Sequence, residues 1–231
     1  LSTGTRAAPA DPDPDSDPNS GANQRDEFWV CRRSIHVDAS REGTASCDEF
    51  RRGLRENHSE HEMEYTPSIS GVERLAQWPV EAAVEGGWTG VDMHVNMITH
   101  TFQPTSLISP RSFISLVISA DLPDGRGFVT VQIPLTCHPA DSMPADLRQK
   151  IISSVPQNTI FAAYASVEQV VVLPSGELEW TMATTSDAGG SIPQWLQRSW
   201  TMGGVPRAVV GDVGLFIGWT ARRRRSYYAS D

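Results

Sequence analysis

The chain has 231 residues, of which 39% are hydrophobic, and a formal net charge of -9. This length and apolar content suit one domain of ordinary size with a substantial core. The acidic balance argues against a general nucleic-acid binder, which needs a basic face to neutralise phosphates. No run of about eighteen apolar residues occurs, so the sequence predicts no membrane-spanning helix.

The cysteine pattern bears on the cellular compartment. Cys31, Cys47 and Cys137 are few and widely spaced, which favours neither a disulfide framework nor a zinc site. We therefore expect a soluble, cytoplasmic protein that uses no metal and no cofactor. The chain starts at Leu1 rather than Met, which leaves open whether a targeting segment was removed before it.

Composition divides the chain into three parts. Residues 1–25 are rich in Pro, Asp, Ser and Gly, and such a segment cannot offset its ordering entropy through burial. We expect a disordered leader there, with an acidic docking tail as the alternative. Residues 26–222 are expected to form the folded domain, and residues 223–231 a basic and polar tail.

The folded part begins with a segment of strand composition over residues 28–37. Ser46 and Glu49 then fit a capping box, which predicts a short helix over about 47–57. Its apolar face would carry Cys47, Phe50 and Leu54, which follow one another at helical spacing.

A dense polar run, NHSEHEME, occupies residues 57–64. His58, His61 and Glu62 are metal-ligand types, but the run lacks the HExxH signature of a helical zinc site. A solvated helix end that leads into a strand is the favoured interpretation.

From residue 88 onward, apolar and polar side chains alternate in successive segments, which is the pattern of half-buried strands. The predicted strands cover about 91–97, 114–122, 129–135, 159–173 and 177–185, with a helix over 144–154 before the fourth. Asp124-Gly125 is a hairpin signal between two of them. We expect an antiparallel meander whose apolar side chains all point to one concave side.

The chain ends in an apolar, helix-forming stretch that starts near Pro193 and that Gly203, Gly204 and Pro206 are expected to interrupt. Its second part carries a stripe of small residues that includes Gly211, Gly214 and Gly218. Since each glycine costs a helix about 1 kcal/mol relative to alanine, we expect a sheet, a ligand or another helix to approach that stripe closely.

Several segments together resemble a fungal START-like domain family of unassigned function, within the START/Bet v 1-like helix-grip superfamily. They are FWVCRRSIHVD, GTASCDEFRRGLRENHSEHEMEYTPSI, SPRSFISLVISADL, DAGGSIPQWLQRS and VGDVGLFIGWT, which run from about Phe28 to Thr220. The SPRSF and GGSIP segments also look like those of lipid-transfer START domains. The resemblance implies an α+β helix-grip fold, in which a curved antiparallel β-sheet wraps around a long C-terminal α-helix over a hydrophobic tunnel. An Asp-Pro leader stands where START domains have a long N-terminal helix.

The leading functional hypothesis is a binder or carrier, rather than an enzyme, of a lipid, sterol or other hydrophobic small molecule in an internal cavity. Arg111, between a proline and an apolar strand, would anchor a polar head; a salt bridge to Asp187 or Glu179 is the alternative. The residues expected to line the cavity with it are Trp88, Leu116, Ile118, Trp180, Met182, Trp195, Val209 and Phe216.

An enzyme of the polyketide cyclase or aromatase type, using the same cavity, is the alternative that the fold analogy suggests. Its candidate catalytic residues are His94, His100 and Asp187. Both histidines have the polar parity of one predicted strand, so they lie on the surface if that face is outside and act as acid or base if it turns inward. A third hypothesis is an interaction module that the acidic leader regulates.

Four arginines, Arg222, Arg223, Arg224 and Arg225, follow the last apolar stretch. They are most simply a cationic helix end that complements the helix dipole. A transient contact with anionic lipid headgroups at a membrane surface is the alternative.

Overall fold

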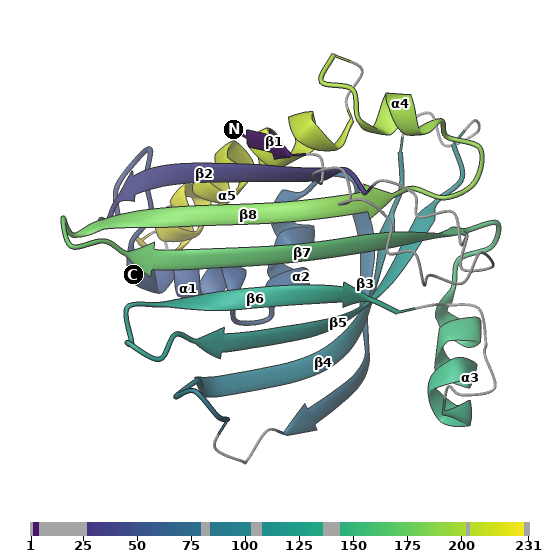
Figure 1. Cartoon of the computed structure of the whole chain (residues 1–231), viewed down its shortest axis with the longest axis horizontal. Coiled ribbons are helices and arrows are strands. Elements are labelled where there is room, and N and C mark those ends of the chain that lie inside the picture. Colours follow the sequence, from purple (N-terminus) through teal and green to yellow (C-terminus); the bar gives the residue numbers. More distant parts are fainter. Residues whose placement is uncertain are drawn as a thin grey trace, which may run out of the picture.

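The structure is a computed structural model, and it describes residues 2–4, 27–79, 84–102, 108–135, 144–201 and 204–228. Within these ranges, one eight-stranded sheet carries a long C-terminal helix across its concave face (Figure 1). The strands are β1 (Ser2–Gly4), β2 (Trp29–Val37), β3 (Ile69–Pro79), β4 (Thr89–His100), β5 (Arg111–Asp121), β6 (Gly127–Pro134), β7 (Ile160–Val172) and β8 (Glu177–Asp187). The helices are α1 (Cys47–Leu54), α2 (His58–Tyr65), α3 (Ala145–Ser154), α4 (Gln194–Gln197) and α5 (Val205–Tyr228).

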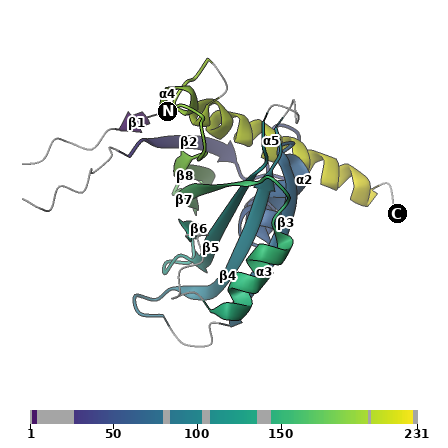
Figure 2. The ribbon, with the colours of Figure 1, turned by 90° about the vertical axis from the view of Figure 1, so that its right-hand side faces the viewer.

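The strands lie in the order β1-β2-β8-β7-β6-β5-β4-β3, and neighbours run antiparallel. The sheet bends around α5 and α2 (Figure 2). In addition, β5 pairs in parallel with the start of β7, beyond the end of β6. The curved antiparallel sheet and the long C-terminal helix confirm the predicted architecture. Of the leader, residues 2–4 pair with β2, and residues 5–26 lie outside the described ranges.

The capping box at the start of α1 is present as predicted. The Ser46 hydroxyl accepts the Glu49 backbone N–H, and the Glu49 carboxylate accepts the Ser46 backbone N–H at 2.8 Å. The helix ends earlier than expected, because Asn57 adopts a left-handed backbone (φ 46°) and a second helix, α2, begins at His58. As predicted, this segment is helical, leads into β3 and exposes Met63 and Glu64. The prediction of a solvated segment was wrong for its start, since His58 and Ser59 are buried.

An aromatic cluster joins α1, α2 and α5 to the sheet. Phe216 of α5 stacks near Phe50, Trp180 and Tyr65, with ring centroids 4.9, 5.3 and 5.8 Å away. All four side chains are at least nine-tenths buried. This half of the interior is close-packed, as native cores are.

The apolar faces of β4, β5 and β6 point the other way from the prediction. Leu116 packs with Val95 and Ile114 against Ile151 of α3, in a cluster on the face opposite α5. Ile118 shares that face, because it lies two residues from Leu116 in the same strand. α3 covers part of this outer face, whereas Ile133 of β6 stays 44% exposed, and the polar set faces α2 and α5.

The prediction holds for β8, where Trp180 and Met182 face the helices. A second expectation, about the glycine stripe of α5, was wrong. Among the residues that the structure describes, a Cβ at Gly211 or Gly214 would meet nothing within 4 Å, so no described element approaches them closely. Close approach occurs instead at Gly204, just before the helix, where a Cβ would lie 2.3 Å from the Gln197 carbonyl oxygen.

Candidate functional site

A cavity of about 510 Å³ lies between the first turns of α5 and the concave face of the sheet. Its apolar wall includes Ile98, Phe113, Met182, Leu196, Val205 and Val209. Its polar groups include Glu62, His100, Arg111, Tyr164 and Asp212. The aromatic cluster bounds one end, because Trp180 precedes Met182 by two residues on β8 and Phe216 follows Asp212 by one turn on α5. The site is therefore hollow where the other half of the interior is filled.

Arg111 is the buried cation of this cavity. It is 4% exposed, and its guanidinium donates to the backbone carbonyls of Ala188 (3.4 Å) and Ser109. Among the described residues no carboxylate lies within ion-pair distance of it: Asp187 caps the turn at Gly189, and Glu179 pairs with Arg33. The salt bridge that the sequence offered as an alternative is thus not formed.

The acidic and imidazole groups of the cavity are tuned by burial. Burial raises the pKa of Asp212 to about 7, and the neighbouring carboxylate of Glu62 adds to the rise while Arg32 opposes it. Burial also raises the pKa of Glu62. Burial lowers the pKa of His100 to about 4. Near neutral pH, His100 is therefore uncharged and Asp212 is divided between its two protonation states.

Both candidate histidines point to the concave side without any change of register, because the polar parity of β4 is its inner face. His100 lines the cavity. His94 lies deeper and is 2% exposed, and its Nδ1 is 2.7 Å from an Asp92 carboxylate oxygen. Of the two, only His100 is among the residues that line the cavity itself.

The other predicted lining residues divide into three groups. Arg111, Met182 and Val209 do line the cavity. Trp180 and Phe216 belong to the aromatic cluster, and Leu116 and Ile118 face away. Trp195 lies on α4 with 64% of its surface exposed, and Trp88 precedes β4 at the end opposite His100.

Sequence reasoning did not place Glu62, Tyr164 or Asp212 in the cavity, although it had singled out Glu62 as a metal-ligand type. A signal for Asp212 was available, because it is the charged residue within the stripe that runs Val205, Val209, Asp212, Phe216 at helical spacing. A carboxylate on the buried face of a helix is costly unless a hydrogen-bond or ion-pair partner compensates it, so it often marks a functional site.

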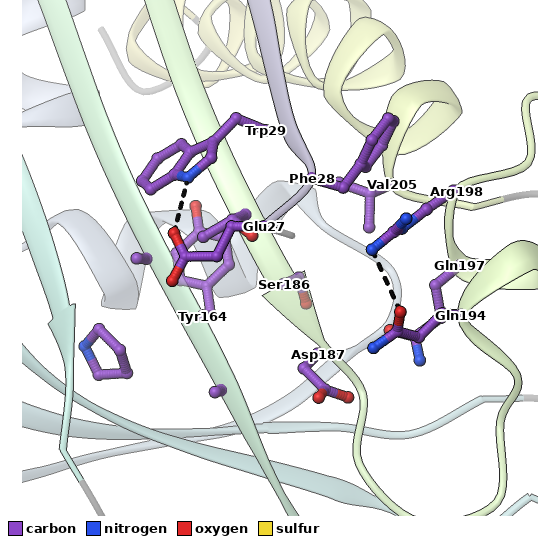
Figure 3. A pocket seen from close by; sticks show the side chains of 14 residues that line it. Glu27, Phe28, Trp29, Tyr164, Ser186, Asp187, Gln194, Gln197, Arg198 and Val205 are labelled. Carbon is purple, nitrogen blue, oxygen red and sulfur yellow. Dashed lines mark hydrogen bonds between the residues drawn. The ribbon is translucent and has the colours of Figure 1, made fainter. Parts of the chain in front are cut away.

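The third candidate for acid or base chemistry, Asp187, lies at a smaller pocket of about 280 Å³ beside the start of β2 (Figure 3). There Trp29 donates its indole N–H to Glu27 at 3.1 Å, and Arg198 donates to Gln194 at 3.1 Å. The Asp187 carboxylate accepts the Gly189 backbone N–H at 2.9 Å. Asp187 therefore caps a turn and is not among the residues that line the cavity beneath α5, although the two pockets share Tyr164, Ser186, Gln197 and Val205.

The four arginines 222–225 lie within α5, which continues to Tyr228, and two of them make contacts inside the fold. Arg224 binds Glu49, and Arg223 pairs with Glu64 at 3.1 Å and lies over Trp219. Arg222 and Arg225 are exposed. None of the helices in the described ranges is both long enough and apolar enough to cross a membrane.

Comparisons with known proteins agree with this architecture. The profile of the family described as "Protein of unknown function (DUF3074)" matches residues 29–220. The crystal structure of human STARD10 superposes with a TM-score of 0.58 at 12% identity, covering 89% of this chain and 69% of that one. Human StAR-related lipid transfer protein 5 gives a TM-score of 0.56 at 14% identity, covering 87% and 77%. No curated protein matches the chain in sequence. The fold is thus the START-like helix-grip fold.

Proposed function

We propose that this chain, which belongs to the DUF3074 family of unknown function, binds a lipid, sterol or other hydrophobic small molecule beneath α5. The observation that carries the proposal is a mostly apolar cavity of about 510 Å³ beside a close-packed aromatic cluster. Ligand pockets typically measure about 300–1,000 Å³ and combine apolar walls with a few polar groups. The fold shared with a protein named for lipid transfer supports the same class of ligand.

Arg111 would anchor an anionic or strongly polar group of the ligand. Its guanidinium is buried, lines the cavity and has no carboxylate partner among the described residues. A buried cation without a counter-ion is costly, and an anionic ligand group would remove that cost. Arg222 and Arg225 are exposed and would supply any contact with an anionic membrane surface.

The test is native mass spectrometry of the gently purified protein, followed by a panel of lipids and sterols. We expect at least one apolar species to bind in a one-to-one complex and to raise the melting temperature. Phe113→Trp, which narrows the cavity, should abolish that binding. Val167→Trp is the matched control, because Val167 is 43% exposed and points away from the cavity. If no species binds to the wild-type protein, the proposal is wrong.

An enzyme of the polyketide cyclase or aromatase type is the second candidate, and one observation favours it. His100 and Asp212 both line the cavity, and a carboxyl group with a pKa of about 7 can donate or accept a proton at neutral pH. Conversion of a polyketide-like substrate that His100→Gln or Asp212→Asn removes would support this activity. Unchanged turnover in both variants would exclude these two residues as its acid and base.

A further inference from the structure

A second set of polar side chains lies deeper than the cavity lining. Ser59, His94, Asn96 and Gln132, together called the polar floor, are between 0% and 3% exposed. Five of their polar atoms lack a hydrogen-bond partner among the described residues: Ser59 Oγ, His94 Nε2, Asn96 Nδ2, Asn96 Oδ1 and Gln132 Oε1. Buried polar groups in native proteins nearly always have partners, so a cluster of unpaired ones needs an explanation.

Strand register brings the polar floor together on the concave face. His94 lies opposite Val117, which in turn lies opposite Gln132, and Asn96 lies two residues from His94 on the same side of β4. From above, His58 of α2 approaches Gln132 at 3.3 Å, and Ser59 follows it in the helix. The polar floor therefore lies between the first turn of α2 and the centre of the sheet.

The polar floor adjoins the cavity at two places. Asn96 pairs across the strands with Ser115, which lines the cavity. Ser59 precedes Glu62 by three residues on α2, and Glu62 also lines the cavity. A molecule in the cavity could thus present one end to the floor. Arg111 lies elsewhere, four residues before Ser115 along β5.

The unpaired atoms offer neutral hydrogen bonding of both kinds. Asp92 accepts the Nδ1 proton of His94, which leaves Nε2 as an acceptor, and burial lowers the pKa of this histidine. Asn96 supplies a donor and an acceptor, Gln132 an acceptor, and Ser59 either. The charged groups that act on His94 are already engaged, because Asp92 binds its Nδ1 and Arg74 pairs with Glu60 at 2.7 Å. None of the four floor residues would balance a charged ligand group, whereas an alcohol could both donate and accept.

We propose that the polar floor binds the hydroxyl end of an apolar ligand, directly or through one bridging water, so that the cavity selects an alcohol over its methyl ether. This inference rests on the proposed function and specifies the ligand class. Asn96 is the central residue, because both of its side-chain polar atoms are unpaired. A site built to hydrogen-bond a hydroxyl rejects the analogue that lacks the donor, since its own buried groups then stay unpaired.

The experiment is a direct competition between dodecan-1-ol and dodecyl methyl ether, supplied at equal concentration and read as bound ratios by native mass spectrometry. For the wild-type protein we expect the alcohol to be favoured about tenfold. Asn96→Leu, which keeps the approximate shape, should bring the ratio close to one. The control is Met97→Leu, the next residue, which is buried on the opposite face and should leave the preference intact.

Gln132→Met provides a second variant if Asn96→Leu does not fold, and it should also reduce the preference. A ratio near one for the wild-type protein with both probes bound, or an unchanged preference in the folded variants, would overturn this inference alone. If both probes fail to bind the wild-type protein while the lipid and sterol panel yields a complex, this inference is wrong and the proposed function stands; if the panel fails as well, both are wrong.

Discussion

Individual glycines have opposite roles in the two helices that meet at the aromatic cluster. At Gly53 of α1, a Cβ would lie 2.5 Å from a Phe216 ring carbon and 2.7 Å from a Trp219 ring carbon. We predict that Gly53→Ala lowers the free energy of unfolding by about 1–3 kcal/mol, because the rings must shift. Gly211→Ala should raise it by about 0.5–1 kcal/mol, since Gly211 is exposed and alanine favours the helix. Urea denaturation measures both changes, and equal effects would contradict the packing described.

Asp212 makes stability depend on pH in an unusual direction. Its pKa is about 7 in the folded protein, well above the ordinary value of 3.8, so the folded state binds more protons between these values. Its contribution to stability is therefore complete below pH 3.8 and is lost as the pH rises through 7. We predict that Asp212→Asn stabilises the protein above pH 7 by an amount on the order of 2 kcal/mol.

Thermal unfolding of the wild-type protein and Asp212→Asn from pH 4 to pH 8 checks this prediction. The two should differ least at the acidic end and most at the basic end. A constant difference across this range would show that Asp212 keeps its ordinary pKa.

Arg111 should determine how strongly the cavity prefers an anionic ligand to an uncharged one. We predict that Arg111→Met weakens the binding of an anionic probe, dodecanoic acid, at least about tenfold, because the charge-assisted hydrogen bonds are lost. Binding of an uncharged probe, dodecan-1-ol, should change little. Arg126→Met is the control, since that arginine lies in an exposed turn and pairs with Asp124. Equal weakening of both probes would indicate a structural role for Arg111.

At the scale of elements, an ion pair connects the C-terminal part of α5 to the first turn of α1. The Arg224 guanidinium binds the Glu49 carboxylate and the backbone carbonyl oxygen of Thr44, and the side chains of Arg224 and Glu49 are each 16% exposed. Although burial alone would raise the pKa of Glu49, the hydrogen bonds from Arg224 and Ser46 lower it.

We predict that Arg224→Met lowers the free energy of unfolding by about 2 kcal/mol, because it leaves a half-buried carboxylate without its partner. Arg225→Met, at the neighbouring exposed position, should change it by less than about 0.5 kcal/mol. Chemical denaturation of the two variants distinguishes the roles. If both arginines matter equally, the run acts through its total charge instead.

The elements also show how far sequence reasoning reaches. Period-two alternation locates β4, β5, β6 and β8, and the Ser46 capping box locates α1, because both signals are local. Alternation does not say which face of a strand is covered. In β5 the apolar parity faces α3, which is encoded some thirty residues later in the chain, and the polar parity that includes Ser115 lines the interior. The candidate site was therefore only partly predictable, since its polar members depend on long-range packing.

The molecule as a whole has one filled half and one hollow half beneath the same helix. Phe216 is fully buried in the aromatic cluster, whereas Phe113 borders the cavity. We predict that Phe216→Leu costs about 2 kcal/mol of stability, while Phe113→Leu costs less and changes ligand affinity instead. Paired measurements of melting temperature and probe binding test this division. A stability loss at Phe113 as large as that at Phe216 would show that the second half is packed like the first.

β6 ends before the part of β5 that pairs with β7, and this bears on where related sequences can gain or lose residues. Beyond β6, Arg111, Ser112 and Phe113 of β5 pair directly with the beginning of β7. That pairing fixes the two strands independently of the connection between Leu135 and Pro144. Insertions or deletions in this connection should leave the alignment of both strands intact, so related chains are free to differ in length at this point while they retain the same interior.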